Sequence, residues 1–178
     1  MPQEADRRHA GPEARRNHGP DRTWIVLASI LAVAALLRVS YLTELARQPD
    51  FASPTADAAF HDYWARGLLS GDWTPPAGMP NPHIPERPFL RPPGYPYFLS
   101  LLYLLTGRSY LGARILQMLL GVVNLLLLYL LAREIFGKRA GLLAAALGTA
   151  YWAFLFYEGE LQAPVFLIPL ILGVFLSL

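Results

Sequence analysis

Residues 110–131 read YLGARILQMLLGVVNLLLLYLL, an apolar run in which Arg114 is the one charged residue. An α-helix needs about 20 mainly apolar residues to cross a bilayer. A helix on the surface of a soluble protein carries its apolar residues on one face, whereas this run is apolar almost all round. The stretch therefore predicts a helix that spans a membrane.

The rest of the sequence has the same character. Hydrophobic residues make up 54% of the 178 and charged residues 16%, whereas a soluble domain usually carries about a quarter charged residues. Three more apolar runs, at 24–45, 140–157 and 161–178, are about long enough to span. We expect an all-α membrane protein, a multi-span helical bundle. Because Leu178 ends an apolar run with no flanking positive charge, we also expect the chain to end inside a larger protein.

The N-terminal segment differs from the rest. Residues 1–22 are rich in Arg, His, Pro and Gly and poor in large apolar side chains, which predicts a disordered cytoplasmic tail. The run at 24–45 is longer than the apolar part of a signal peptide, and no clear cleavage site follows it. We interpret it as a retained span, so that residues 23–178 form the N-terminal part of a membrane domain.

Basic residues predict the topology. Five arginines precede Trp24, and a second basic cluster lies at 133–139. If both face the cytoplasm, an even number of crossings separates them. The apolar run at 95–106 is too short to cross, so we expect a re-entrant or interfacial helix there. The loop at 46–94 then lies outside the cytoplasm, and no nucleic-acid surface is indicated.

The outer loop contains one helical pattern. Nine prolines between Pro75 and Pro96 exclude a continuous helix in its second half. Earlier in the loop, residues 57–69 place four large apolar side chains on one helical face: Phe60, Tyr63, Trp64 and Leu68. This spacing predicts an amphipathic interfacial helix that lies flat on the bilayer.

Carboxylates gather on the outer side. The loop region holds six acids, and two more follow the third apolar run, namely Glu44, Asp50, Asp57, Asp62, Asp72 and Glu86, then Glu158 and Glu160. A carboxylate at the bilayer surface can act as a general base toward a hydroxyl. Asp57 is our first choice because it opens the amphipathic helix, with His61 one turn further on the same face. The alternative is that Asp57 only caps that helix.

Two arginines are candidates for anion binding. Arg91 precedes the short helix at headgroup depth, where a guanidinium suits a lipid phosphate, with snorkelling as the alternative. The predicted topology brings Asp57 and Arg91 to the same headgroup layer. Arg38 lies well inside the first span and should face the protein interior or an anionic partner, or else snorkel. We expect Arg114, Gln117 and Asn124 to hold helices together.

Glu160 lies at the outer end of a span and is a candidate to steer an acceptor or to hold a cation with Asp57, with a solvated helix-end carboxylate as the alternative. The histidines outside the helix, His9, His18 and His83, have no compact ligand spacing, so we predict no metal site and no cofactor. A divalent cation has no support in the sequence.

The order of these blocks resembles the C-type membrane glycosyltransferases, in the branch of protein O-mannosyltransferases and lipid A aminoarabinose transferases. The blocks that carry the resemblance are DAAFHDYWAR at 57–66, SGDW at 70–73, RPPGYPYFL at 91–99, LAREIFG at 131–137 and FYEGEL at 156–161. The resemblance implies an inverting transfer of a sugar from a polyprenyl-phosphate donor to a hydroxyl of a protein, lipid or glycan. It places this reaction on the extracytoplasmic side of a bacterial cytoplasmic membrane.

The resemblance also implies residue roles. By position, Asp57 matches the catalytic aspartate of the family and Arg91 the basic residue that contacts the donor phosphate. We predict further substrate contacts at His61, Asp62, Glu160, Arg38 and Tyr95. Many relatives carry an acid before a proline at the start of the fourth run, where this chain has Ala163 and Pro164, so Glu160 is a candidate replacement.

Two other classes of function stay open. A transporter or lipid flippase would use Arg38 and the outer acids as a substrate pathway, and it would show an internal repeat or spans broken near the midplane, which the sequence does not show. A non-catalytic membrane anchor or assembly subunit would bind a partner through the loop and would need no particular acid.

Overall fold

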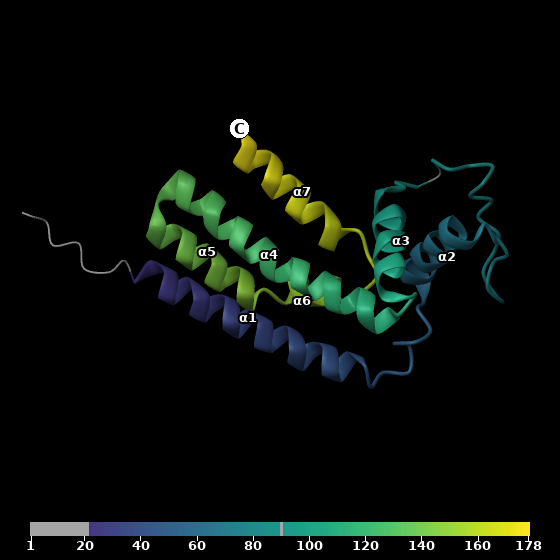
Figure 1. Ribbon diagram of the computed structural model, residues 1–178, viewed down its shortest axis with the longest axis horizontal. Helices are drawn as coiled ribbons and strands as arrows, with labels where there is room; N and C mark the ends of the chain where they lie inside the picture. The colour runs from purple at the N-terminus through teal and green to yellow at the C-terminus, as the bar shows by residue number, and fades with distance from the viewer. Residues whose placement is uncertain (1–21, 90) are drawn as a thin grey trace, which may run out of the picture.

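The computed structural model describes residues 22–89 and 91–178 (Figure 1). The predicted disordered tail therefore lies outside the described residues, apart from Arg22. The described residues form seven α-helices and no strand, which confirms the all-α class.

Two helices, α1 (Thr23–Leu45) and α4 (Tyr110–Phe136), are long and apolar enough to cross a membrane. They pack with α5 (Lys138–Ala150) around the buried side chains of Leu27, Tyr129 and Ala145. Both helices also leave large apolar side chains exposed, among them Leu36 and Leu119. Exposed apolar surface on a spanning helix is suited to contact with lipid.

The apolar run predicted at 140–157 is broken in the structure. It forms α5 and α6 (Trp152–Gly159), which meet at a bend of 56°. Tyr151, between them, has an extended backbone with φ −78° and ψ 103°. The hydroxyl of Thr149 donates to the carbonyl of Ala145 in the last turn of α5, an interaction that often bends helices. The two helices together have the composition of one broken span.

The fourth apolar run forms α7 (Pro164–Ser177), which packs against α4. It begins later than the expected start at residue 161 because Pro164 occupies the first turn, where a missing N–H does no harm. As described, α7 has 14 residues and is shorter than a full crossing.

Two shorter helices, α2 (Ala56–Ser70) and α3 (Gly94–Thr106), lie at the end of the bundle opposite the start of α1 (Figure 1). The short helix expected at 95–106 is α3, which lies steeply across the direction of α4. A buried core that includes Tyr95, Leu99 and Leu161 joins α2, α3, α4 and the start of α7.

The apolar face of α2 is covered by protein. Tyr63 and Trp64 are 3% and 2% exposed, and they pack with Ile84 and Trp73 of the following loop. The Tyr63 hydroxyl donates to the carbonyl of Trp73 at 2.8 Å. The helix is amphipathic as predicted, but this face contacts the protein where we expected lipid, because the proline-rich loop folds back over it.

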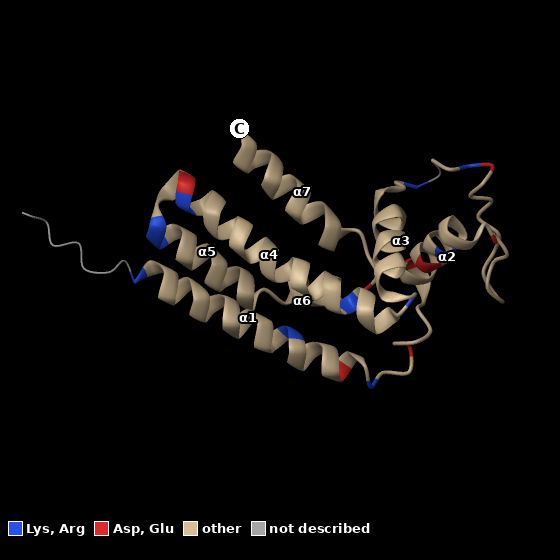
Figure 2. Ribbon diagram, in the orientation of Figure 1, with Lys and Arg blue, Asp and Glu red and all other residues tan. Residues whose placement is uncertain are grey.

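Charged residues gather at the two ends of the molecule, and most of the length of α1, α4 and α7 carries none (Figure 2). The start of α1 and the turn between α4 and α5 lie at the same end (Figure 1). Arg22 and the basic cluster at 133–139 belong to this end, and α2 and α3 lie at the other. This arrangement has the geometry that the predicted topology requires, and the assignment of each end to a side of the membrane stays a prediction.

Candidate functional site

Asp57 and Arg91 form an ion pair at the end of the bundle that carries α2 and α3. Arg91 Nη1 donates to Asp57 Oδ1 at 2.9 Å, although the residues are 34 apart in the sequence. The cap position of α2 is occupied by Thr55, so the interpretation of Asp57 as the cap is wrong. Asp57 lies in the first turn, where the helix dipole favours negative charge. Both side chains are accessible, with exposures of 51% for Arg91 and 62% for Asp57.

Arg91 has a second contact, with an aromatic ring. Its guanidinium carbon lies 4.5 Å from the centre of the Phe60 ring, a cation–π geometry. The carboxylate and the ring together orient the guanidinium. Since a guanidinium has five N–H donors and the ion pair uses one nitrogen, others remain for an anion.

His61 lies one turn after Asp57 and contacts two other segments. Its Nδ1 is 2.8 Å from the carbonyl oxygen of Leu161. The imidazole ring packs edge-on against Tyr95, with ring centres 4.9 Å apart. Burial lowers the pKa of the His61 imidazole; the Leu161 carbonyl and Asp57 oppose this shift, and Arg91 adds to it. The ring is therefore neutral at pH 7.

A chain of hydrogen bonds continues from Tyr95 into the bundle. The Tyr95 hydroxyl donates to Gln117 Oε1 at 2.6 Å. Gln117 Nε2 donates to the carbonyl of Glu158 at 3.0 Å and to that of Glu160 at 2.9 Å. Gln117, which we expected only to hold helices together, thus connects α3 to the turn that carries Glu160.

Glu160 lies at the end of α6 beside a buried arginine. Burial raises the pKa of the Glu160 carboxyl, and the charge of Arg114 opposes this shift. Arg114 donates to the carbonyls of Gly159 at 2.8 Å and Phe51 at 2.7 Å. These bonds bring the start of the outer loop to the turn after α6. Glu160 is joined to the Asp57 side of the site through Gln117, Tyr95 and His61.

Asp62 faces the interior and holds α2 in place. It is 7% exposed, and it accepts hydrogen bonds from the Tyr103 hydroxyl at 2.6 Å and the Tyr110 hydroxyl at 3.0 Å. Arg66 Nε also donates to it at 3.0 Å, and an Arg66 Nη2 bond to Tyr110 closes the cluster. Asp62 is buried and binds side chains of α2, α3 and α4, so its position does not support the predicted substrate contact.

Arg38 is buried in a second ion pair. Its Nη2 lies 2.7 Å from Glu158 Oε1, and the two side chains are 3% and 4% exposed. Its Nη1 donates to the carbonyl of Ala34, one turn earlier in α1. The side chain thus points toward the start of the helix and away from the outer end, so it does not snorkel outward. An anionic partner was expected for Arg38, and the structure shows that this partner is Glu158.

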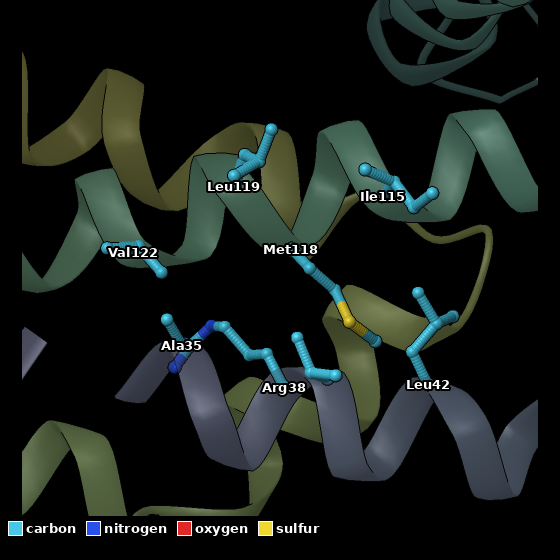
Figure 3. A pocket seen from close by; sticks show the side chains of 8 residues that line it. Ala35, Arg38, Leu42, Ile115, Met118, Leu119 and Val122 are labelled. Atoms are coloured by element: carbon cyan, nitrogen blue, oxygen red, sulfur yellow. The ribbon is translucent and has the colours of Figure 1, made fainter. Parts of the chain in front are cut away.

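Figure 3 shows Arg38 between α1 and α4, in the lining of a small apolar groove with Met118 and Leu119. Glu158, which we had placed among the outer acids, is 3% exposed. Gly121 of α4 leaves the space that the Glu158 carboxylate occupies, because it has no side chain. A Cβ atom at this position would collide with the carboxylate. Both side chains are buried, so their position does not support a substrate contact.

The described residues define an integral membrane protein, in which an accessible acid–arginine pair lies at one end of an apolar helix bundle. Within residues 22–89 and 91–178, no group of three or more His, Cys, Asp or Glu side chains could hold a metal ion.

Comparison with known families identifies the chain more closely. Residues 90–178, half of the sequence, match the dolichyl-phosphate-mannose-protein mannosyltransferase family, and the chain belongs to this family. Its members are membrane glycosyltransferases that use a polyprenyl-phosphate-linked sugar as donor. No curated protein and no solved structure matches the chain. The matched region includes Arg91 and Glu160, and it begins after Asp57 and His61.

Proposed function

We propose that this protein transfers a sugar, with inversion, from a polyprenyl-phosphate donor to a hydroxyl of a protein, lipid or glycan. The proposed side is the extracytoplasmic face of a bacterial cytoplasmic membrane. The observation that carries the proposal is the accessible pair of Asp57 and Arg91, 2.9 Å apart, at the end of the bundle away from Arg22 and the basic cluster at 133–139. Transfer from a phosphate needs a base for the hydroxyl and a cation for the leaving group, and this pair can supply both.

The pair divides the chemistry as follows. The bond to Arg91 uses Asp57 Oδ1, which leaves Oδ2 to take the proton of the acceptor hydroxyl. The acceptor oxygen then forms a bond to the anomeric carbon from the face opposite the phosphate, and the bond from that carbon to the phosphate oxygen breaks. The electron pair leaves with the phosphate, whose growing negative charge the Arg91 guanidinium stabilises.

The other predicted site residues have different supporting observations. His61 adjoins the pair, and we retain it as a sugar contact. Tyr95 is buried and packs against the His61 ring, so we propose that it positions His61. Gln117 bonds to the Tyr95 hydroxyl and to the backbone carbonyl of Glu160, which holds the turn near the site, and we retain Glu160 as a residue that steers the acceptor. Arg38 and Asp62 both form buried contacts within the protein, and we propose no substrate contact for either residue.

The proposal is tested with Asp57→Asn in the full chain, reconstituted in liposomes with polyprenyl-phosphate mannose and a hydroxyl acceptor. Loss of a general base lowers the rate of transfer by roughly 10²–10⁴-fold. Because the Asp57 side chain is 62% exposed, the amount of protein in the membrane should not change. Glu86→Gln, at another exposed acid of the same loop, is the matched control. Transfer by D57N at the wild-type rate would refute the assignment of the base.

Arg91 is tested by donor binding. Arg91→Ala should weaken the binding of polyprenyl-phosphate mannose and also slow transfer, because the phosphate loses a charged hydrogen-bond donor. Arg87→Ala, in the same loop, serves as control. An unchanged dissociation constant for the donor in R91A would exclude Arg91 from the phosphate site.

One observation favours the transporter hypothesis, because the break at Tyr151 interrupts an apolar helix pair and broken spans are common in transporters. The same liposomes distinguish the two functions. Movement of the lipid-linked sugar across the bilayer without transfer of the sugar would support a transporter. Transfer to the acceptor supports the glycosyltransferase.

A further inference from the structure

The two nitrogens of His61 have different environments. Nδ1 lies 2.8 Å from the Leu161 carbonyl oxygen, and since a carbonyl only accepts, Nδ1 carries the hydrogen. In a neutral imidazole the other nitrogen, Nε2, then has a free lone pair. No described residue forms a hydrogen bond to Nε2. The backbone of the turn after α6 therefore fixes the tautomer of a histidine on α2.

The imidazole ring lies within the proposed site. Asp57 on α2 and Arg91 in the segment before α3 both act electrostatically on the ring. Tyr95 of α3 contacts the ring edge-on, and Phe60, which lies under the Arg91 guanidinium, is 6.0 Å away between ring centres. Leu161, whose carbonyl binds Nδ1, follows Glu160 in the chain. The ring is only part-buried.

The proposed chemistry identifies what the ring faces. Arg91 contacts the phosphate and Asp57 takes the acceptor proton, so the transferred sugar lies against this pair. His61 is a neighbour of both groups and is therefore placed against the sugar. The acceptor hydroxyl gives its proton to Asp57. The hydroxyls of the transferred sugar therefore remain as hydrogen-bond donors to Nε2.

We propose that His61 Nε2 accepts a hydrogen bond from one hydroxyl of the transferred sugar and thereby makes His61 a specificity-determining residue. This inference rests on the proposed function. It requires a neutral imidazole, because protonation replaces the lone pair with a second N–H donor. Burial lowers the pKa of His61, which keeps the lone pair available at pH 7.

The test uses His61→Asn in the full chain in liposomes. The asparagine amide can still donate near the Nδ1 position to Leu161, but it places no acceptor at Nε2. The donors are polyprenyl-phosphate mannose and the analogues in which each sugar hydroxyl in turn is replaced by hydrogen. Wild type should use one of these analogues about tenfold less efficiently than mannose in kcat/KM, and H61N should lose that discrimination. His83→Asn, a histidine of the outer loop, is the control.

A second measurement needs no variant. The discrimination of wild type against the same analogue should vanish as the pH falls through the pKa of His61, which burial places below its ordinary value, because the protonated imidazole has no lone pair at Nε2. Discrimination that stays constant while His61 becomes protonated, or H61N with wild-type discrimination, would overturn the role of Nε2 and leave His61 as a link between α2 and the turn. If wild type transfers no sugar at all, the proposed function fails and this inference fails with it.

Discussion

The buried pair of Arg38 and Glu158 gives a sharp prediction for stability. Its atoms Nη2 and Oε1 are 2.7 Å apart, and the two side chains are 3% and 4% exposed. Glu158 Oε2 already lacks a partner in the described structure. Arg38→Met would therefore leave the entire carboxylate unpaired inside the bundle. Removal of one member of such a pair costs about 3–5 kcal/mol, a large part of the roughly 5–15 kcal/mol that stabilises a typical protein.

The double variant separates the charge from the packing. Glu158→Gln alone leaves the guanidinium unpaired and should cost a similar amount, about 3–5 kcal/mol. In R38M/E158Q neither charge remains, so its loss of stability should be smaller than the sum of the single losses by at least about 2 kcal/mol.

The measurement is the free energy of unfolding of the full chain in mixed detergent and lipid micelles. Arg47→Met is the control, because Arg47 pairs with Glu44 on the surface with exposures of 73% and 67%, and its loss should cost less than about 1 kcal/mol. Additive single effects, or R38M as stable as wild type, would refute the reasoning.

Two further predictions concern packing and topology. Gly121→Ala should destabilise the protein by about 1–3 kcal/mol in the same unfolding assay, because its Cβ would overlap the Glu158 carboxylate. Gly173→Ala is the control and should be at least as stable as wild type, because its Cβ meets no atom within 4 Å. Equal effects at both positions would contradict the packing argument. The chain has no cysteine, so single cysteines at Thr74 and Lys138 can be labelled with an impermeant reagent, and they should react from opposite sides of the membrane. Labelling of both from one side would exclude the predicted topology.

The spanning helices could be predicted from the sequence because length and hydropathy are local properties. The helix expected at 24–45 is observed as Thr23–Leu45. The helix expected at 110–131 extends to Phe136 and includes Arg133, the first residue of the second basic cluster. It ends at Gly137, whose φ is +88°. The apolar pattern at 140–157 did not indicate the break at Tyr151.

The two acids after the third run show where sequence reasoning ends. Glu158 and Glu160 look alike in the sequence, and both were placed on the outer side. Their burial differs because Glu158 contacts Arg38, which is 120 residues away, and the space beside Gly121. The position of Arg38 within a span indicated an anionic partner, because a buried cation needs an anion. The sequence did not indicate which acid this partner would be.

The proximity of Asp57 and Arg91 could be expected from topology, since both flank short helices on the same side of the membrane. Their hydrogen bond is observed, and their catalytic roles stay proposals. The cover over α2 was missed, although the apolar residues Trp73, Met79 and Ile84 within a proline-rich loop were a usable signal.

The proline-rich loop that covers α2 has a consequence for Asp57 on the same helix. Each proline restricts φ before the chain folds, so fixing a segment with nine prolines between Pro75 and Pro96 loses less conformational freedom than fixing an ordinary loop. A stiff segment can therefore press on Tyr63 and Trp64 without the regular hydrogen bonds of a helix or a sheet. The middle of α2 is held from outside by backbone that was already restrained. Arg91 of the same segment bonds to Asp57, so the orientation of this carboxylate is set at a small entropic cost.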